Sequence, residues 1–220
     1  MIEGNSRVLT CPYCGGDKEV LSLDSGNNFG ERIWTDNKTV APMLPKVSYV
    51  QQCPCCGKYF LISWQKTSRY SSSRCGETGD LDYQQLKAAY KQVMADTDFP
   101  LDERDYLTVL YYLLWGFNDQ YNRKFDSPEE NRTYDQAPDE DNIFIKKCIS
   151  EIIGILTSRE DIDHLMIAEL YREAEDYASA AAELQKETNP HNIKFRRNLK
   201  EKLTELIAAH DCLVYEITAL

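Results

Sequence analysis

Two short cysteine motifs stand in the first quarter of the 220-residue chain: Cys11-Pro12-Tyr13-Cys14-Gly15 and Cys53-Pro54-Cys55-Cys56-Gly57. In each motif two cysteines enclose two residues, so a tight turn can bring both sulfur atoms to one ion. The proline supports entry into the turn, and the glycine allows the close backbone approach that points amide N–H groups at sulfur. Four thiolates satisfy a tetrahedral zinc ion. The motifs therefore predict one metal site with the ligands Cys11, Cys14, Cys53 and Cys56.

The repetition of the motif is what favours a metal. A single C-x-x-C would also suit a redox dithiol, and unrelated buried cysteines or disulfides are the alternative for the pair. Disulfides are rare in the reducing compartment that we expect for this chain. Cys55 lies between the ligands of the second motif and is expected to point away from the ion.

The two motifs resemble the turns of a zinc ribbon, whose rubredoxin-like form presents two C-P-x-C-G turns from β-hairpins. The resemblance implies a small β-rich domain organised by Zn²⁺. Rubredoxin itself binds iron and transfers electrons, and four thiolates do not distinguish the two metals. We favour zinc, because a closed structural site would organise a segment with little core of its own. The 38 residues from Gly15 to Gln52 are many for a minimal site, and predicted strands fill them.

Short apolar stretches bounded by turn formers indicate strands in the first part of the chain. No helical period of useful length appears before residue 80. The expected strands lie at 19–23, 32–35, 39–40, 47–50 and 59–64.

The second part changes to a helical period, with Leu86, Ala89, Tyr90, Val93 and Met94 on one face of a first helix. Asp102 is a suitable N-cap for a second helix that extends to Tyr121. The acidic stretch 126–141, with two prolines, is predicted to be a loop. Four more helices are expected at 143–156, 160–174, 177–187 and 192–214, and the last counts Leu213 and Val214 on its apolar side.

Charge and composition divide the chain in the same place. Residues 1–78 carry a net charge of +2 and residues 79–220 a net charge of −13, which together make the −11 of the whole chain. Six of the eight cysteines lie at or before Cys75. We therefore predict an α+β protein of two domains: a β-rich zinc ribbon at 1–70, a linker at 71–80 and an all-α antiparallel helical array at 81–220.

The stretch from Ile167 to Ala180 resembles a tetratricopeptide repeat, a pair of antiparallel helices with small residues where they cross. Ile167, Ala168 and Tyr171 match positions of the first helix. Tyr177, Ala180 and Leu184 match positions of the second helix. Glu175 stands where the family usually has glycine at the turn. The match covers about one repeat, and any alanine-rich helical hairpin is the alternative.

As a whole, the chain resembles bacterial proteins that join an N-terminal zinc ribbon to a tetratricopeptide-like helical domain, a group with no known reaction. The resemblance implies a cytoplasmic protein whose helical part binds a protein partner, because stacked helical pairs expose an extended concave face. The N-terminus lacks the apolar core of an export signal. The longest apolar run, Tyr106 to Phe117, is too short to cross a membrane, so no membrane partner is expected.

No catalytic motif appears in the sequence, and we predict a non-enzymatic protein. The three histidines are His164, His191 and His210. A dyad such as His164 with Cys148 would need partners from different elements, and Cys148 lies among isoleucines typical of a core. Cys75, Cys148 and Cys212 have no assigned role.

A nucleic-acid-associated zinc ribbon is the alternative to the adaptor. Basic residues cluster where the last helix begins: Lys194, Arg196, Arg197, Lys200 and Lys202. Aromatic residues of the first part offer platforms that can stack on bases: Trp34, Tyr59, Phe60 and Trp64. A solvated helix face and a small aromatic core are the simpler interpretations, and the acidic total disfavours binding of polyanions.

Overall fold

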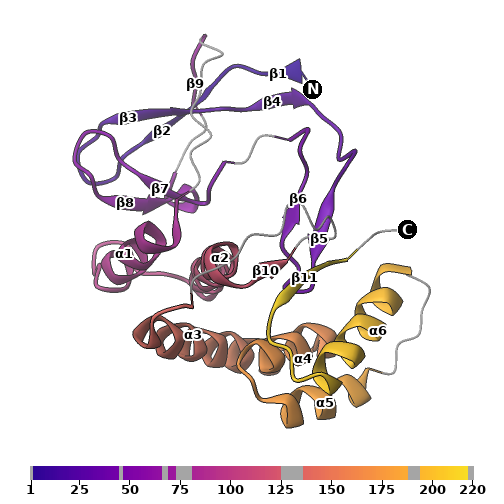
Figure 1. Ribbon diagram of the computed structural model, residues 1–220. Coiled ribbons are helices and arrows are strands. Elements are labelled where there is room, and N and C mark those ends of the chain that lie inside the picture. Colours follow the sequence, from indigo (N-terminus) through magenta and orange to yellow (C-terminus); the bar gives the residue numbers. More distant parts are fainter. Residues whose placement is uncertain are drawn as a thin grey trace. The chain divides into compact units, whose positions relative to one another are not determined.

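The computed structural model describes residues 2–44, 47–65, 69–72, 81–124, 136–187 and 194–217. Within this part, short strands precede six α-helices, so the predicted mixture of α and β structure is confirmed (Figure 1). The chain forms two compact units. The first consists of Met1–Glu31 and Ala41–Gly116, and the second of Arg32–Val40 and Phe117–Leu220.

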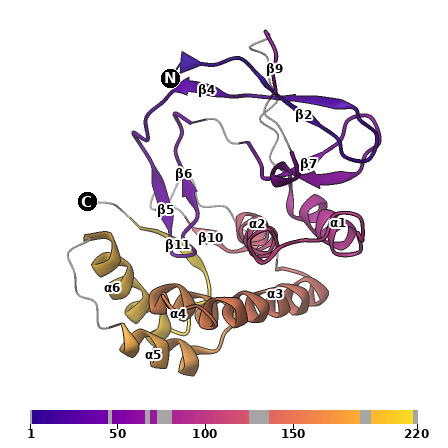
Figure 2. The ribbon, with the colours of Figure 1, turned by 180° about the vertical axis from the view of Figure 1, so that it is seen from behind.

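The strands of the first unit pair as antiparallel hairpins. β2 (Arg7–Thr10) lies between β3 (Asp17–Val20) and β9 (Arg69–Tyr70), and β7 (Val50–Gln52) pairs with β8 (Tyr59–Leu61). β1 (Ile2–Glu3) pairs with β4 (Leu23–Ser25). The turns of the β2–β3 and β7–β8 hairpins lie on the same side of the unit (Figures 1 and 2). Each of these two turns carries one of the cysteine motifs.

Two helices complete the first unit. Asp82 caps α1 (Tyr83–Met94) by accepting the Gln85 N–H, and α1 packs on β8. α2 (Glu103–Tyr121) begins at the predicted cap, where Asp102 accepts the Asp105 N–H at 2.7 Å. A Cβ on Gly116 would lie 2.7 Å from a Leu86 methyl group, so this glycine allows α1 and α2 to approach closely.

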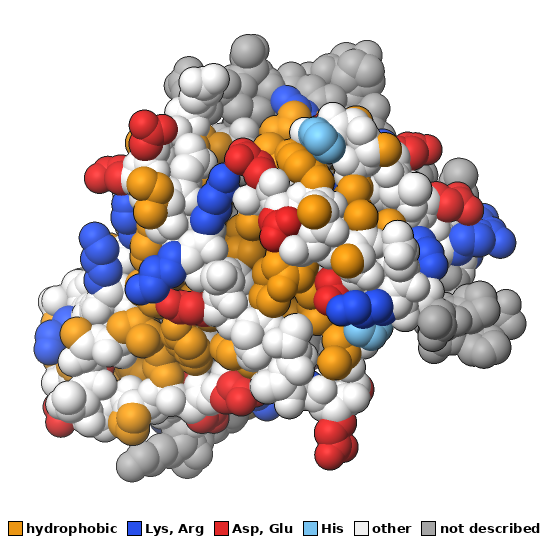
Figure 3. Space-filling view, turned by 90° about the horizontal axis from the view of Figure 1, so that it is seen from below, with side chains coloured by type: hydrophobic (Ala, Val, Ile, Leu, Met, Phe, Trp, Pro, Cys, Tyr) orange, Lys and Arg blue, Asp and Glu red, His pale blue; other side chains and the backbone are white. Residues whose placement is uncertain are grey.

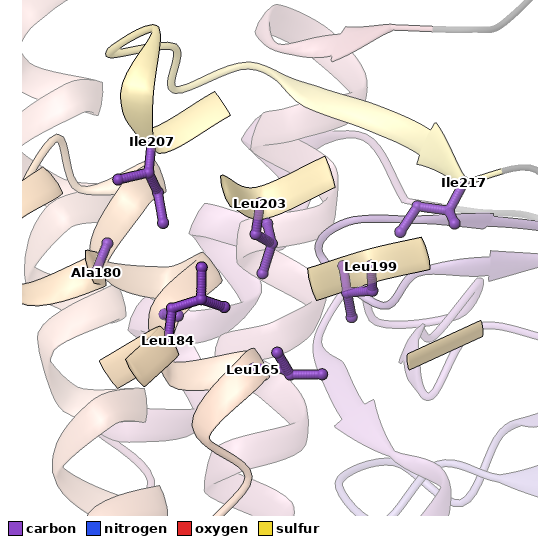
Figure 4. Packing of buried hydrophobic residues seen from close by; sticks show 8 residues of the cluster. Leu165, Ala180, Leu184, Leu199, Leu203, Ile207 and Ile217 are labelled. Carbon is purple, nitrogen blue, oxygen red and sulfur yellow. The ribbon is translucent and has the colours of Figure 1, made fainter. Parts of the chain in front are cut away.

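The second unit contains the remaining helices of the described chain. They are α3 (Asp139–Thr157), α4 (His164–Glu173), α5 (Tyr177–Lys186) and α6 (Lys194–Ala208). α4, α5 and α6 enclose one apolar cluster, to which Leu165, Leu184 and Leu203 contribute (Figure 4). Ile217 of the final strand also joins this cluster.

The start of α3 differs from the prediction. Residues 139–141, expected in a loop, form the first turn of this helix, where three carboxylates face the positive end of the helix dipole. The rest of the predicted loop lies largely outside the described residues. Ile143, counted on the apolar face of the helix, is 71% exposed, whereas Ile145 and Ile149 are buried.

A small sheet in the second unit corrects the prediction of an all-α segment. β5 (Arg32–Trp34) and β6 (Thr39–Val40) form a hairpin, and β11 (Val214–Ile217) pairs antiparallel with β5. β10 (Arg123–Lys124) pairs parallel with β11, so the strand order is β10-β11-β5-β6. Residues 32–40, which the sequence assigned to the ribbon, thus lie in the same unit as α3 to α6.

The last helix ends six residues before the predicted Val214, and His210 explains why. This residue has a left-handed backbone with φ 51°. Its N–H donates to the Ile207 carbonyl, and the Asp211 N–H donates to the Leu206 carbonyl at 3.0 Å. These two bonds form a Schellman cap, which turns the chain out of the helix toward β11. The usual glycine is absent from this position, so the sequence contained no stop signal.

Glu175 ends α4 in the same way. It has φ 67°, its N–H donates to the Arg172 carbonyl, and the Asp176 N–H donates to the Tyr171 carbonyl at 2.9 Å. Asp176 then caps α5 by accepting the Ser179 N–H. The α4–α5 hairpin therefore turns through a left-handed residue, a conformation that glycine usually supplies at the end of a helix and that a glutamate adopts here.

A buried arginine binds the strands of the second unit to its helices. Arg172 is fully buried and pairs with Glu169 of the same helix through two bonds of 2.6 and 2.7 Å. Its guanidinium also donates to the carbonyls of Asp211 and Leu213, which lead into β11, and to the Thr35 hydroxyl after β5 at 3.4 Å. A single side chain thus joins three segments that are distant in sequence.

A second buried ion pair lies within the same unit. Arg123 donates to the buried carboxylate of Asp36 at 2.7 Å and lies over the Trp34 ring at 4.9 Å. Asn118 donates both to Asp36, at 3.0 Å, and to Glu173, at 2.8 Å. Glu173 has one carboxyl oxygen without a hydrogen-bond partner among the described atoms. Burial, followed by the charges of Glu169 and Asp36, raises the pKa of Glu173 well above its ordinary value of 4.5.

The compact units divide the chain at other places than the predicted domains 1–70 and 81–220. α1 and most of α2 lie in one unit with the cysteine hairpins, and residues 32–40 lie in the other. Most of the predicted linker 71–80 falls outside the described residues. The sequence showed where the period changes from strand to helix, but it did not show which helices pack on which strands.

The turn at Glu175 provides the first test of this fold. Replacing Glu175 by glycine should raise the free energy of unfolding by about 1 kcal/mol, because glycine has no Cβ to resist a left-handed backbone. Glu175→Ala is the matched control, since it also removes the surface ion pair with Lys146 but keeps a Cβ. Urea unfolding measures both. Equal stability of the two variants would contradict the turn geometry.

A buried acid that holds its proton makes stability depend on pH. Because the pKa of Glu173 is higher in the folded than in the unfolded chain, its contribution is complete below pH 4.5 and is lost as pH rises through the folded pKa. Glu173→Gln should therefore weaken the decline of stability between acidic and neutral pH, and the variant should gain free energy of unfolding at neutral pH.

The measurement is chemical unfolding across a series of pH values, with the exposed Glu201→Gln as control. The control should follow the wild-type pH dependence. If Glu173→Gln follows it as well, Glu173 is ionised in the folded protein and the assignment is wrong.

Candidate metal centre

The two cysteine turns have the same backbone geometry. In the first, the Cys11 N–H donates to the Gly16 carbonyl at 2.8 Å and the Gly15 N–H donates to the Cys11 carbonyl at 2.9 Å. In the second, Cys53 bonds to Lys58 and Gly57 to Cys53, each at 2.9 Å. The glycines of the two turns have φ values of 71° and 73°, a left-handed conformation that glycine adopts without strain. We call each of these turns, with its two cysteines, a knuckle. The two knuckles have the same backbone geometry because their motifs share the pattern C-P-x-C-G.

The four predicted ligands lie together. The Sγ atoms of Cys11, Cys14, Cys53 and Cys56 are all within 4.8 Å of one another. The Cys11–Cys56 and Cys14–Cys53 sulfur distances are 3.7 and 3.6 Å. A tetrahedron with Zn–S bonds of about 2.3 Å has edges of about 3.8 Å, so these two distances match the spacing that such an ion requires. The four close cysteines can hold a metal ion.

The first cysteine of each knuckle is buried and the second is exposed. Cys11 and Cys53 are each 2% exposed and lie in an apolar cluster with Leu9, Val20 and Phe60. Cys14 and Cys56 lie on the outer side of the site. The ligands are therefore part of the core of the first unit and are also reachable from solvent.

The thiols influence each other's protonation strongly. Burial acts to raise the pKa of Cys53, but N–H groups of Cys56 and Cys55 and the neighbouring thiols outweigh it and lower the pKa to about 6. The Gly16 N–H acts to lower the pKa of Cys14, yet the bond with Cys56 and burial raise it to about 12. The neighbouring thiols thus shift the pKa values of Cys53 and Cys14 in opposite directions. A bound divalent cation would favour the thiolate form of its ligands.

The third residue differs between the knuckles. Tyr13 of the first donates its hydroxyl proton to Asp96 at 2.6 Å and packs edge-on against Phe99, while Lys58 lies over its ring at 4.5 Å. Cys55 of the second is exposed and is not among the four clustered cysteines. Burial, followed by the charge of Cys53, raises the pKa of Cys55.

Side chains of α1 and of the segment after it hold the knuckles in place. Gln92 accepts from the Tyr59 N–H at 3.0 Å and donates to the Tyr59 carbonyl at 2.8 Å, so α1 binds β8 directly after the second knuckle. Trp64 stacks on Phe99 at 5.1 Å, next to Tyr13. The candidate metal site is thus held by contacts with α1 and with the segment after it. The cysteine spacing does not reveal these contacts.

The remaining candidate residues have structural surroundings. Cys148 is 1% exposed, and burial raises its pKa to about 12. His164 bonds to Glu183 at 2.8 Å, and His210 stacks on Tyr177. Cys212 is partly exposed. Cys75 and His191 lie outside the described residues.

The features that favoured nucleic acid serve packing and ion pairs where the structure describes them. Arg196 pairs with Asp163 and Glu187 at 3.1 Å, and Lys200 donates to the Glu187 carbonyl at 2.9 Å. Trp34 and Phe60, expected as possible stacking platforms, are buried at 2% and 0% exposure.

An apolar groove of about 340 Å³ runs between α5 and α6. Leu184 and Ile207 line it beside Lys200 and Thr204. The face in Figure 3 shows hydrophobic side chains gathered in patches that charged residues border. Among the described helices, none has the length and apolar character needed to cross a membrane.

Comparison with known proteins adds no relative. No protein-family model matches the chain, and no curated protein or solved structure matches it. The interpretation of the site therefore depends on the residues and geometry described above.

A cysteine series tests the ligand assignment. Cys14→Ser and Cys56→Ser should each lose bound metal, because a serine hydroxyl is a much weaker ligand than a thiolate for zinc. Cys55→Ser is the matched control, as it changes the same knuckle without touching the ligand set. Metal content by mass spectrometry should remain one ion per chain in the control. Retention of metal by Cys14→Ser, or its loss from Cys55→Ser, would refute the assignment.

Proposed function

We propose that the chain is a non-enzymatic zinc-binding adaptor: a structural Cys₄ zinc site in the first unit, and a helical part that binds a protein partner. The observation that carries the metal half is the convergence of four sulfur atoms from two similar turns, all within 4.8 Å of one another. Four protein ligands leave no coordination position for a substrate, which supports a structural rather than a catalytic ion.

The surroundings of the site support a role in folding. The apolar cluster at the knuckles is small, and two of its members, Cys11 and Cys53, are themselves ligands. An ion bound by these residues would complete the core and link the β2–β3 hairpin to the β7–β8 hairpin. Small units of this kind commonly depend on a metal for stability.

The adaptor half is supported by charge and by the helical hairpin. Residues 79–220 carry the net charge of −13, which opposes binding of nucleic acid or anionic membranes. The resemblance of residues 167–180 to a tetratricopeptide repeat and the tight left-handed turn at Glu175 support a helical pair that can bind a partner. We therefore propose that the helical part binds a protein partner. Binding of nucleic acid is the alternative function.

Metal analysis tests the first half of the proposal. The purified chain should contain one zinc ion and be colourless, and Co²⁺ exchange should give the intense absorption of a tetrahedral thiolate site. A red protein with one iron per chain would instead indicate a rubredoxin-like electron carrier. Metal-free protein that folds normally would contradict a structural ion altogether.

Removal of the ion should unfold the first unit. The cysteine spacing alone predicted that only residues 1–70 depend on the metal, but α1 packs on the knuckle strands and should lose protection with them. Hydrogen exchange with and without a strong chelator measures this. We expect amides of the first unit to exchange faster, while α4 and α5 keep their protection. Unchanged protection in β2, β3 and α1 would contradict the role in folding.

The partner class is tested with full-length protein. We expect no shift of mixed DNA and RNA even at low salt, and retention of a protein partner at both low and moderate salt. Binding to phosphates falls steeply as salt rises, whereas apolar protein contacts do not. Robust nucleic-acid binding at low salt that disappears at moderate salt would overturn the adaptor proposal.

A further inference from the structure

The third residue of each knuckle lies against the residue that directly follows the other knuckle. Tyr13 of the first knuckle lies under Lys58, the residue that follows the second knuckle. Cys55 of the second knuckle lies against Gly16, the corresponding residue after the first. The two contacts correspond in position but differ in chemistry. The Tyr13 ring lies under a lysine, whereas the Cys55 thiol lies beside a glycine.

The absence of a side chain at Gly16 leaves room for the Cys55 thiol next to a metal ligand. A Cβ added to Gly16 would lie 2.7 Å from the Cys55 sulfur and 3.3 Å from the Cys14 sulfur. The two sulfur atoms are therefore separated by no more than the sum of these distances. Both Cys14 and Cys55 are exposed to solvent. A fifth thiol thus lies close to an accessible ligand and outside the tetrahedral set.

We propose that Cys55 is an oxidative modification site, which forms a disulfide with Cys14 in the presence of a peroxide and thereby releases the zinc ion. This inference rests on the proposed zinc site. The disulfide removes one ligand from the ion, and the remaining three thiolates bind it more weakly.

The chemistry balances with hydrogen peroxide as the oxidant. The Cys14 thiolate, which a bound zinc ion would keep deprotonated, attacks one peroxide oxygen, so that an S–O bond forms, the O–O bond breaks and hydroxide leaves. The Cys55 thiol then attacks the sulfur of the sulfenic acid. The S–S bond forms, the S–O bond breaks, and water leaves with the thiol proton. The two sulfur atoms lose two electrons in total, and the peroxide gains them.

Geometry selects Cys14 among the four ligands. Cys11 and Cys53 are buried, so a peroxide reaches them less readily. Cys56 is exposed but directly follows Cys55 in the chain. Neighbouring Cα atoms are about 3.8 Å apart, shorter than the usual disulfide range of about 4.4–6.8 Å. Cys14 is the exposed ligand of the other turn, and its sulfur lies close to that of Cys55.

The test follows zinc release from zinc-loaded full-length protein with a chromogenic chelator during peroxide treatment. Alkylation and peptide mapping identify the disulfide. We expect release to accompany a Cys14–Cys55 disulfide, and dithiothreitol with added zinc to restore the site. Cys55→Ser should contain the same zinc before treatment, release it several-fold more slowly and lack this disulfide.

Cys212→Ser is the matched control, because it removes another accessible thiol that lies outside the site, and it should release zinc like the wild type. Two results would overturn the inference while leaving the zinc site intact. One is that Cys55→Ser releases zinc as fast as the wild type. The other is that Cys55 of the wild type can still be alkylated after peroxide treatment. Absence of zinc before treatment would instead overturn the proposed function, and this inference with it.

Discussion

Four sulfur atoms from two hairpins of the first unit lie within 4.8 Å of one another, and two of them belong to its apolar cluster. The neighbouring thiols lower the pKa of Cys53 and raise that of Cys14. An ion bound by all four sulfur atoms would hold the β2–β3 and β7–β8 hairpins together. Hydrogen bonds of Tyr13 with Asp96 and of Gln92 with Tyr59 connect the same hairpins to α1 and to the segment after it.

The second unit has a different organising element, a fully buried arginine. Arg172 satisfies its donors on Glu169, on two backbone carbonyls and on Thr35, so that one planar group orients a helix, a hairpin and the final strand. A buried ion pair is weak evidence for net stability, because desolvation offsets much of the attraction. Its effect here is positional: Glu169 compensates the charge, and the neutral acceptors on residues 35, 211 and 213 satisfy the remaining donors, so arrangements that remove these acceptors would leave buried N–H groups unpaired.

The cysteine site could be predicted from the sequence because its signal is local. Two residues between cysteines, followed by glycine, determine the turn without reference to the rest of the chain, and the four ligands lie together as expected. The periodicities likewise predicted α1, and Asp102 marked the start of α2. In each case the deciding contacts lie within a few residues of one another.

The sequence predictions are wrong where contacts between distant residues, or residues unusual for their position, determine the structure. Val214 was assigned to the last helix because Leu213 and Val214 continue an apolar pattern, and His210 does not have the appearance of a helix terminator. Strand β11 forms only by pairing with β5, nearly two hundred residues earlier. The charges of Arg172 and Glu173 gave no sign of burial, since side chains of this kind usually lie on the surface.

The placement of residues 32–40 explains the long interval between the knuckles. The chain leaves the first unit after Glu31, contributes β5 and β6 to the second, and returns at Ala41. The loop that a bound metal ion would close therefore contains a hairpin that is held within the second unit, by Asp36 with Arg123 and by Thr35 with Arg172. Doubling the length of such a loop costs only about 0.6 kcal/mol in closure entropy. This cost is small beside the roughly 10–16 kcal/mol of a structural zinc site. A metal centre can thus tolerate an insertion that belongs to another unit, and the same insertion links the two units through the chain.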